Sequence, residues 1–172
     1  MGFLKVLLNN LMKGPATEAF PFGPPPAAPH YRGRVAFDPA SCTGCGMCEL
    51  VCPGGAIRID RDAAGLQLTI WHNTCVFCGL CAHYCLSKAI RQTDDWHLAH
   101  PQAEKFHLVE RGRVSMIPCV GCGKPILPLS DEVMRLAFKG RTTEIERLRR
   151  LCPDCRRIAS IREMRHAHRS LV

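Results

Sequence analysis

The sequence predicts an α+β fold centred on two similar units, each running strand, cysteine loop, short helix and strand. The first observation behind this is an internal repeat, in which a shift of 33 residues superposes Cys42, Cys45, Cys48 and Cys52 on Cys75, Cys78, Cys81 and Cys85. The same shift aligns non-ligand positions, namely Gly46 with Gly79, Ala56 with Ala89, Ile57 with Ile90 and Arg58 with Arg91. The second observation is composition: 6% of residues are aromatic and 12 are Cys, so a small apolar core must be supplemented by metals or disulfides.

The N-terminal region, residues 1–34, is predicted to be a helix followed by an extended segment. Residues 1–13 place Phe3, Leu4, Leu7, Leu8 and Leu11 on one helical face, and Gly14 and Pro15 end the helix. Residues 15–34 contain six Pro and predict an extended strap. Since a 13-residue helix is marginal by itself and the strap separates it from the core, we expect it to dock on a partner subunit at a membrane surface.

The central region, residues 35–93, holds the repeat, with strands expected at 57–59 and 66–70. The C-terminal region, residues 94–172, begins with a polar stretch, 94–112, that is expected to be irregular. A helix is predicted from Asp131 to Lys139, with Ser130 as its N-cap and Gly140 after its end. A second helix is predicted from Thr143, where Thr143 and Glu146 match a capping box, and the basic tail after Cys155 is expected to be helical.

The cysteines favour metal ligation over disulfides. Ten of the twelve fall in C-x2-C pairs or triplets, and Cys52 and Cys85 follow the two triplets at C-x3-C spacing; this is the spacing of ligands. Residues 1–15 lack the apolar region and cleavage site of a secretory signal, and no run of 18 apolar residues predicts a membrane span. We therefore expect a reducing compartment.

Residues 42–53 read C-x2-C-x2-C-x3-C-P, which is the bacterial ferredoxin run whose fourth Cys ligates the other cluster. Three thiolates in one loop can wrap a cubane, while the fourth, on the following helix, points to the neighbouring site. The repeat then predicts two [4Fe–4S] clusters, one on Cys42, Cys45, Cys48 and Cys85 and the other on Cys75, Cys78, Cys81 and Cys52. One departure is that Leu86 follows Cys85 where Pro53 follows Cys52. Zinc is disfavoured in these runs because structural zinc sites use two C-x2-C pairs.

A third unit has that paired spacing. Four thiolates in two C-x2-C pairs form a tetrahedral S4 site, and here they are Cys119, Cys122, Cys152 and Cys155. Zinc with a structural role is favoured over a single rubredoxin-like iron, and both over unligated thiols. The unit is therefore predicted to be a zinc-ribbon or rubredoxin-like module.

No catalytic site is predicted. His83 lies between two cysteines of the second run and His72 precedes that run, but the thiolate sets are complete without them, so each is expected to face solvent or form a hydrogen bond. No acid/base pair, nucleophile elbow or phosphate loop is present, so the chain is not expected to be an enzyme by itself or to bind a small-molecule substrate.

The formal charge of +8 does not by itself predict nucleic-acid binding. Three thiolate-bound sites at about −2 each would reduce it to about +2. A zinc-ribbon nucleic-acid binder remains an alternative because of Arg147, Arg149, Arg150, Arg156 and Arg157, but base-stacking aromatic residues are missing there.

On these motifs the chain resembles the iron–sulfur subunit of formate hydrogenlyase, hydrogenase-4 and CO-induced hydrogenase complexes, which are membrane-bound group 4 [NiFe]-hydrogenases. The resemblance rests on the short helix, the strap that ends in Tyr31-Arg32-Gly33, both ferredoxin runs, the stretch Cys75-Val76-Phe77-Cys78-Gly79 and the following C-x2-C…C-P-x-C unit. The core and strap also resemble the related subunit of respiratory complex I, which normally lacks the four-Cys unit.

The resemblance implies an electron-transfer subunit between a ferredoxin-like (polyferredoxin) donor subunit, fed by formate or CO oxidation, and the [NiFe] module where protons are reduced. It implies contacts with the hydrogenase small and large subunits and a membrane-arm subunit, and a peripheral position on the cytoplasmic side of the inner membrane. A complex I-type NADH:quinone oxidoreductase subunit and a free soluble ferredoxin remain alternatives.

Overall fold

The structure is a computed structural model of the whole chain, and it describes residues 2–14, 17, 22–23, 27–140 and 142–169, with side chains described as far as residue 162. The chain divides into two compact units, Met1–Tyr31 and Arg32–Val172, which are treated separately below.

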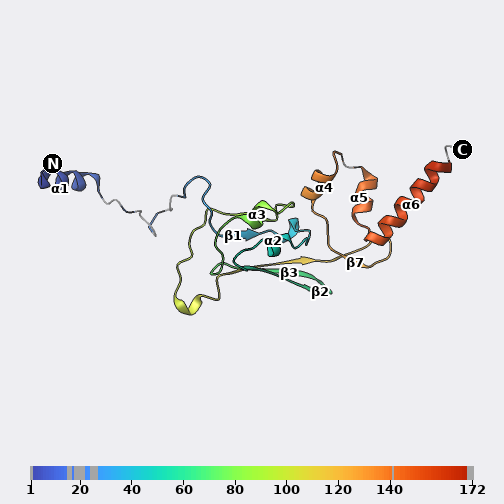
Figure 1. Cartoon of the computed structure of the whole chain (residues 1–172), viewed down its shortest axis with the longest axis horizontal. Coiled ribbons are helices and arrows are strands. Elements are labelled where there is room, and N and C mark those ends of the chain that lie inside the picture. Colours follow the sequence, from blue (N-terminus) through green and yellow to red (C-terminus); the bar gives the residue numbers. More distant parts are fainter. Residues whose placement is uncertain (1, 15–16, 18–21, 24–26, 141, 170–172) are drawn as a thin grey trace. The chain divides into compact units, whose positions relative to one another are not determined.

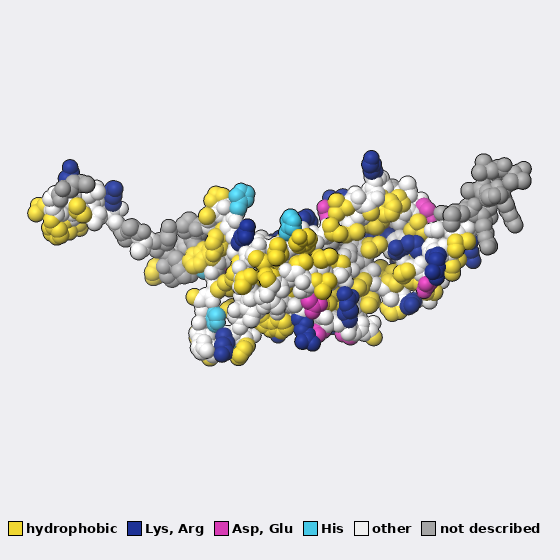
Figure 2. Space-filling view, viewed as in Figure 1, with side chains coloured by type: hydrophobic (Ala, Val, Ile, Leu, Met, Phe, Trp, Pro, Cys, Tyr) yellow, Lys and Arg dark blue, Asp and Glu magenta, His cyan; other side chains and the backbone are white. Residues whose placement is uncertain are grey.

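The first unit contains helix α1 (Phe3–Lys13), which confirms the predicted helix. Its apolar side chains are largely exposed, with Phe3 at 78%, Leu4 at 69% and Leu11 at 74%, and Figure 2 shows hydrophobic side chains gathered on part of its surface. Much of the predicted strap, including Pro15, Pro21 and residues 24–26, lies outside the described residues. Among the described helices, none has the length and apolar character that a membrane crossing requires.

The second unit begins with the two repeated halves, whose strands pair across the repeat (Figure 1). Strand β1 (Val35–Phe37) pairs antiparallel with β4 (Ile90–Gln92), so the first strand of one half meets the last strand of the other. Strands β2 (Ile57–Asp62) and β3 (Gly65–Trp71) form an antiparallel hairpin between the halves. Each cysteine loop leads into one short helix, α2 (Met47–Leu50) or α3 (Leu80–His83). This arrangement of helices and sheets confirms the predicted α+β class.

The core of these halves is small and lies on one face of β3. Leu66, Leu68 and Ile70 alternate along that strand and have no exposed surface. Val35 and Ile90 from the β1–β4 pair are also buried in this cluster. Several cysteines pack around it, so the apolar core and the cysteine loops are one structure: Cys42, Cys48, Cys52, Cys75, Cys81 and Cys85.

The prediction that residues 94–112 are irregular is wrong at its end. Strand β5 (Val109–Ser115) pairs antiparallel with the whole of β3, from Gly65↔Ser115 to Trp71↔Val109, and it is preceded by a 3-10 turn, Gln102–Glu104. A second 3-10 turn, Pro39–Ser41, follows β1. Because only Val114 of β5 is buried, the apolar periodicity that identifies a strand in sequence is nearly absent.

The C-terminal module consists of a two-strand hairpin and three helices. Strands β6 (Ile117–Pro118) and β7 (Pro125–Ile126) pair, and they are followed by α4 (Asp131–Ala137), α5 (Thr143–Arg149) and α6 (Pro153–Arg169). The helical tail after Cys155 is thereby confirmed.

The predicted N-cap of α4 is confirmed, and that of α5 is wrong by one residue. The Ser130 hydroxyl accepts from the Val133 N–H as predicted, although α4 ends two residues early. The N-cap of α5 is Thr142 and not Thr143, because the extended backbone of Thr142 directs its hydroxyl to the Ile145 N–H at 3.3 Å.

The repeat also predicts a stabilising substitution at Lys88. Lys88 has a φ of +55° and Gly55, 33 residues earlier, has a φ of +57°, so both halves use a left-handed residue before the strand. We expect Lys88→Gly to raise the free energy of unfolding by about 0.5–1 kcal/mol, since glycine adopts this conformation without steric cost. Gly55→Ala, whose Cβ would meet nothing within 4 Å, is the matched control and should lower stability by about 1 kcal/mol. Anaerobic thermal unfolding of the cofactor-loaded protein measures both, and a less stable Lys88→Gly variant contradicts the prediction.

Candidate cluster and metal sites

The first cysteine loop surrounds a cavity with an empty volume of about 340 Å³. Asp38 caps the 3-10 turn that directly precedes this loop, because its carboxylate accepts from the Ala40 N–H at 3.0 Å. Three cysteines of the loop line the cavity, and the fourth on its wall comes from the other half: Cys42, Cys45, Cys48 and Cys85.

The second loop surrounds a cavity of the same empty volume, about 340 Å³. Its wall again carries three cysteines of the loop and one from the opposite half: Cys75, Cys78, Cys81 and Cys52. The structure thus brings together the two cysteine groups named from the sequence. Cys52 and Cys85 each follow a short helix, α2 or α3, which carries the thiol out of its own loop.

Backbone amides are directed at the cysteine sulfurs in both loops. The Gly44 N–H lies 3.3 Å from the Cys42 Sγ, and the Phe77 N–H lies 3.4 Å from the Cys75 Sγ. Gly44 and Phe77 are related by the repeat, and both have a positive φ, +69° and +52°. Amides directed at sulfur stabilise thiolates, so these loops suit ligation of a metal cluster.

The buried thiols need a cation to lose their protons. Burial raises the pKa of Cys48 to about 12 and that of Cys81 to about 11, and it also raises the pKa values of Cys42 and Cys75. Without a metal these groups stay protonated at neutral pH. Bound iron supplies the positive charge that holds them as thiolates.

Three side chains donate hydrogen bonds to backbone carbonyls of the cysteine loops. The Arg61 guanidinium donates to the Gly44 carbonyl at 2.8 Å, and the Gln92 amide donates to the Phe77 carbonyl at 3.2 Å. The Arg32 guanidinium donates to the Cys78 carbonyl at 3.2 Å. Sequence reasoning missed all three, because each contact joins residues at least 15 apart and Arg61 has no counterpart under the 33-residue shift.

The C-terminal module gathers the other four cysteines at one point. The β6–β7 hairpin supplies two of them and the start of α6 the other two, and their sulfurs lie within 4.8 Å of one another: Cys119, Cys122, Cys152 and Cys155. The Cys122 and Cys152 sulfurs are 3.7 Å apart, too far for a disulfide but close to the edge of about 3.8 Å in a tetrahedron of 2.3 Å metal–sulfur bonds. Among the described residues this is the one His, Cys, Asp and Glu group close enough for a single ion.

Hydrogen bonds shift the pKa values of two cysteines of this group in opposite directions. The Cys152 N–H donates to the Cys119 Sγ at 3.1 Å and, with the Gly121 N–H, lowers the pKa of Cys119. The Cys155 thiol donates to the sulfurs of Cys152 and Cys122, which raises the pKa of Cys155. A divalent ion held by these four residues would draw all four groups into the thiolate form.

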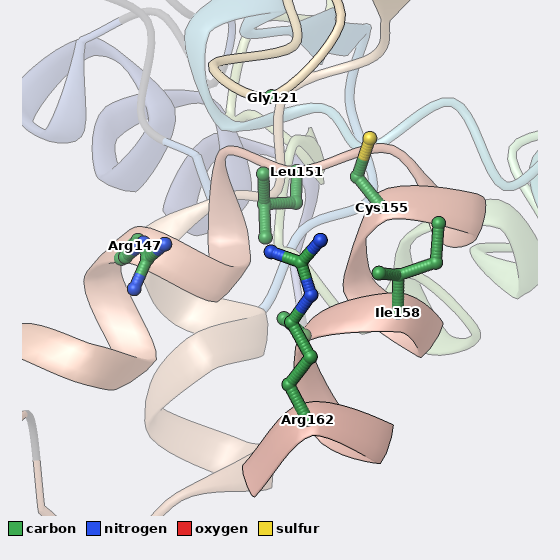
Figure 3. Close-up of a pocket in the computed structure, with 7 residues that line it drawn as sticks. Gly121, Arg147, Leu151, Cys155, Ile158 and Arg162 are labelled. Carbon is green, nitrogen blue, oxygen red and sulfur yellow. The ribbon is translucent and has the colours of Figure 1, made fainter.

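An open cavity with an empty volume of about 840 Å³ lies beside this group, with Cys155 on its wall (Figure 3). Its lining combines apolar and basic side chains, and it consists of Gly121, Arg147, Leu151, Cys155, Ile158, Ala159 and Arg162.

The two histidines of the second run lie in different surroundings. His83 is exposed and packs edge-on against Tyr84, with ring centroids 5.0 Å apart. His72 is 2% exposed, and neither ring nitrogen has a hydrogen-bond partner among the described residues, so the expectation of a solvated or hydrogen-bonded His72 is wrong. Burial lowers the pKa of His72, which keeps the ring neutral.

The comparisons with known proteins agree with these sites. Residues 41–90 match the family described as a 4Fe-4S dicluster domain. Formate hydrogenlyase subunit 6 of Escherichia coli is 28% identical over 162 residues, which cover 90% of this chain and 87% of that protein. NADH-quinone oxidoreductase subunit I 2 of Geobacter metallireducens is 28% identical over 117 residues, which cover 62% of this chain and 89% of that protein.

A structural match is found in the membrane-bound sulfane sulfur reductase, an archaeal respiratory membrane complex, with a TM-score of 0.45, 25% identity and coverage of 83% of this chain and 73% of that one. The sequence comparisons confirm the resemblance drawn from the cysteine runs. The chain thus carries a match to the 4Fe-4S dicluster domain at residues 41–90, and it is a homologue of subunits of formate hydrogenlyase and of NADH-quinone oxidoreductases.

Proposed function

We propose that this chain is an electron-transfer subunit that holds two [4Fe–4S] clusters with crossed ligands. Cys42, Cys45, Cys48 and Cys85 hold the first cluster, and Cys75, Cys78, Cys81 and Cys52 hold the second. The observation that carries this proposal is the pair of equal cavities, each lined by three cysteines of one loop and a fourth from the other half. A bound [4Fe–4S] cluster accepts and releases one electron.

The residues of the chain position the two clusters and tune them. The crossed thiols link the halves, so the two cavities cannot separate without breaking a ligand contact. The amides of Gly44 and Phe77 partly neutralise the thiolates.

The four-Cys group of the C-terminal module holds one zinc ion in this proposal, in a zinc-ribbon or rubredoxin-like arrangement. Its buried apolar cluster is small, with Cys119, Leu151 and Cys152 at its centre, so the ion provides most of the cohesion. A single iron fits the same four thiols, and metal analysis separates the two.

The complex that this subunit serves is proposed to be a membrane-associated hydrogenase of the formate hydrogenlyase kind. The match to formate hydrogenlyase subunit 6 extends over 90% of the chain, and thus into the four-Cys module, whereas the match to the NADH-quinone oxidoreductase subunit covers 62%. Partners would be the hydrogenase subunits, a ferredoxin-like donor and a membrane-arm subunit, on the cytoplasmic side. A complex I-type role is the second candidate, and the 28% identity with subunit I 2 favours it.

The division of labour along the chain follows the predicted regions: 1–34 for docking, 35–93 for the clusters and 94–172 for the metal module. Helix α1 supports the docking role because its apolar side chains are exposed. If the chain acts as a fixed subunit, the isolated protein should self-associate or bind detergent through α1. A stable, monodisperse monomer with an intact α1 would favour a free carrier instead.

Metal and sulfide analysis tests the cofactor content. Anaerobically purified full-length protein is expected to contain about eight iron, about eight acid-labile sulfide and about one zinc per chain. About nine iron without zinc would assign a mononuclear iron to the four-Cys group. Zinc without sulfide would overturn the proposal.

A further inference from the structure

Each cysteine loop carries one guanidinium on a backbone carbonyl, and the two come from different parts of the second unit. Arg61, at 2.8 Å from the Gly44 carbonyl, belongs to β2 and thus to the sheet itself. Arg32, at 3.2 Å from the Cys78 carbonyl, is the first residue of the unit and continues directly from the N-terminal segment. At the loop position that Arg61 occupies in the first half, the second half has the neutral amide of Gln92, on the Phe77 carbonyl.

The residues after Arg32 are fixed against the end of β4. Gly33 is buried, and its N–H donates to the Thr93 carbonyl at 2.8 Å. A Cβ at Gly33 would come within 2.4 Å of the Asp95 carbonyl oxygen and 2.6 Å of that of Thr93, so no side chain fits there. The Arg34 N–H donates to the Asp95 carbonyl at 2.7 Å, and its guanidinium pairs with the Asp95 carboxylate at 3.3 Å. Gly33 and Arg34 thus form an anchor that sets where Arg32 lies.

We propose that Arg61 and Arg32 raise the reduction potentials of the first and second clusters respectively, and that the Gly33–Arg34 anchor sets the second potential by fixing the position of Arg32. This inference rests on the proposed function, since it needs both clusters. It deepens that function by giving the two sites different controls, one internal to the sheet and one at the junction with the docking region.

The physical reason is the charge of the added electron. Reduction adds one negative charge at the site, and a guanidinium hydrogen-bonded to a loop carbonyl stabilises that charge. Among the described residues Arg61 forms no ion pair, so its charge is not neutralised by a neighbouring carboxylate. The nearest acidic side chain on the helix of that loop, Glu49, accepts instead from the Ile59 N–H at 3.0 Å.

The guanidinium of Arg32 and that of Arg61 are both exposed, so mobile ions screen them. Their effects are therefore moderate and should weaken as ionic strength rises. We expect each to change the ratio of reduced to oxidised cluster at a fixed potential by about three- to tenfold, where tenfold corresponds to about 59 mV for one electron.

The test is an anaerobic redox titration of the full-length protein, followed by electron paramagnetic resonance at low salt. Arg61→Gln is expected to lower the first potential alone, and Arg32→Gln the second alone. Gly33→Ala, which pushes the anchor off β4, is expected to lower the second potential as Arg32→Gln does. The double variant Gly33→Ala with Arg32→Gln should show no further shift.

Arg58→Gln is the matched control, because it removes the same charge from the same strand as Arg61→Gln. The Arg58 guanidinium pairs with the Asp60 carboxylate at 3.1 Å and not with a carbonyl of the cysteine loop. This control should move neither potential as far as Arg61→Gln moves the first. Shifts no larger than that of Arg58→Gln in both arginine variants, or a Gly33→Ala variant with both potentials unchanged, would overturn the inference while leaving the clusters in place. Absence of any reducible iron–sulfur signal would instead overturn the proposed function.

Discussion

Replacing Cys52 and Cys75 together by alanine is expected to remove one cluster and leave the other intact. Both thiols line the second cavity, although they lie in different halves of the repeat. Iron should fall from about eight to about four per chain, with the signal of the first cluster retained. Replacing Cys52 and Cys42 together, which takes one thiol from each cavity, should reduce iron to near zero.

The matched pair for this experiment uses the other crossing ligand. Cys85→Ala with Cys42→Ala should remove only the first cluster, and Cys85→Ala with Cys75→Ala should remove both. If ligation followed the sequence without crossing, the two pairs would exchange their results. Iron and sulfide analysis reads the difference directly, because the two arrangements predict opposite outcomes for the same four variants.

The second large effect is expected at Cys152, which is 2% exposed and whose N–H donates to the Cys119 sulfur. Cys152→Ala should reduce zinc from about one per chain to none and unfold the C-terminal module. Structural zinc binding contributes about 10–16 kcal/mol of apparent free energy in small domains, more than the small apolar cluster here can replace. Limited proteolysis should then cleave within residues 116–150, while iron stays near eight per chain.

Val120→Ala is the control for this change, because Val120 lies between two of the ligands with 51% of its surface exposed. It should leave zinc content and protease resistance unchanged. A Cys152→Ala protein that remained resistant to protease after losing zinc would show that packing, and not the ion, holds the module together.

The groups of cysteines that line the two cavities could be predicted from their spacing along the chain. Cys42, Cys45 and Cys48 lie so close in sequence that they must share one loop, and the repeat supplies a partner loop for the displaced Cys52. The strand after each short helix also follows from the repeat, since the 33-residue shift aligns Ile57 with Ile90. The module around Cys119 follows from the two C-x2-C pairs.

The remainder depends on contacts that leave no periodic signal. Strand β5 has two apolar side chains, Val109 and Val114, of which only Val114 is buried, and it is defined by its ladder with β3, which the local sequence does not encode. Arg32 acts through the carbonyl of Cys78, 46 residues away, and an exposed arginine before a glycine has no distinguishing pattern. The burial of the His72 ring could not be predicted from the sequence either, because it depends on packing between distant segments. The α5 cap moved by one position because Thr142 and Thr143 are chemically equal and only the backbone selects between them.

The measurement that tests the central claim most directly is spin quantification of the dithionite-reduced full-length protein by electron paramagnetic resonance. Two neighbouring [4Fe–4S] clusters predict about two unpaired spins per chain, with broadening from the magnetic interaction between them. A protein that contains zinc but shows no reducible iron–sulfur signal would contradict it.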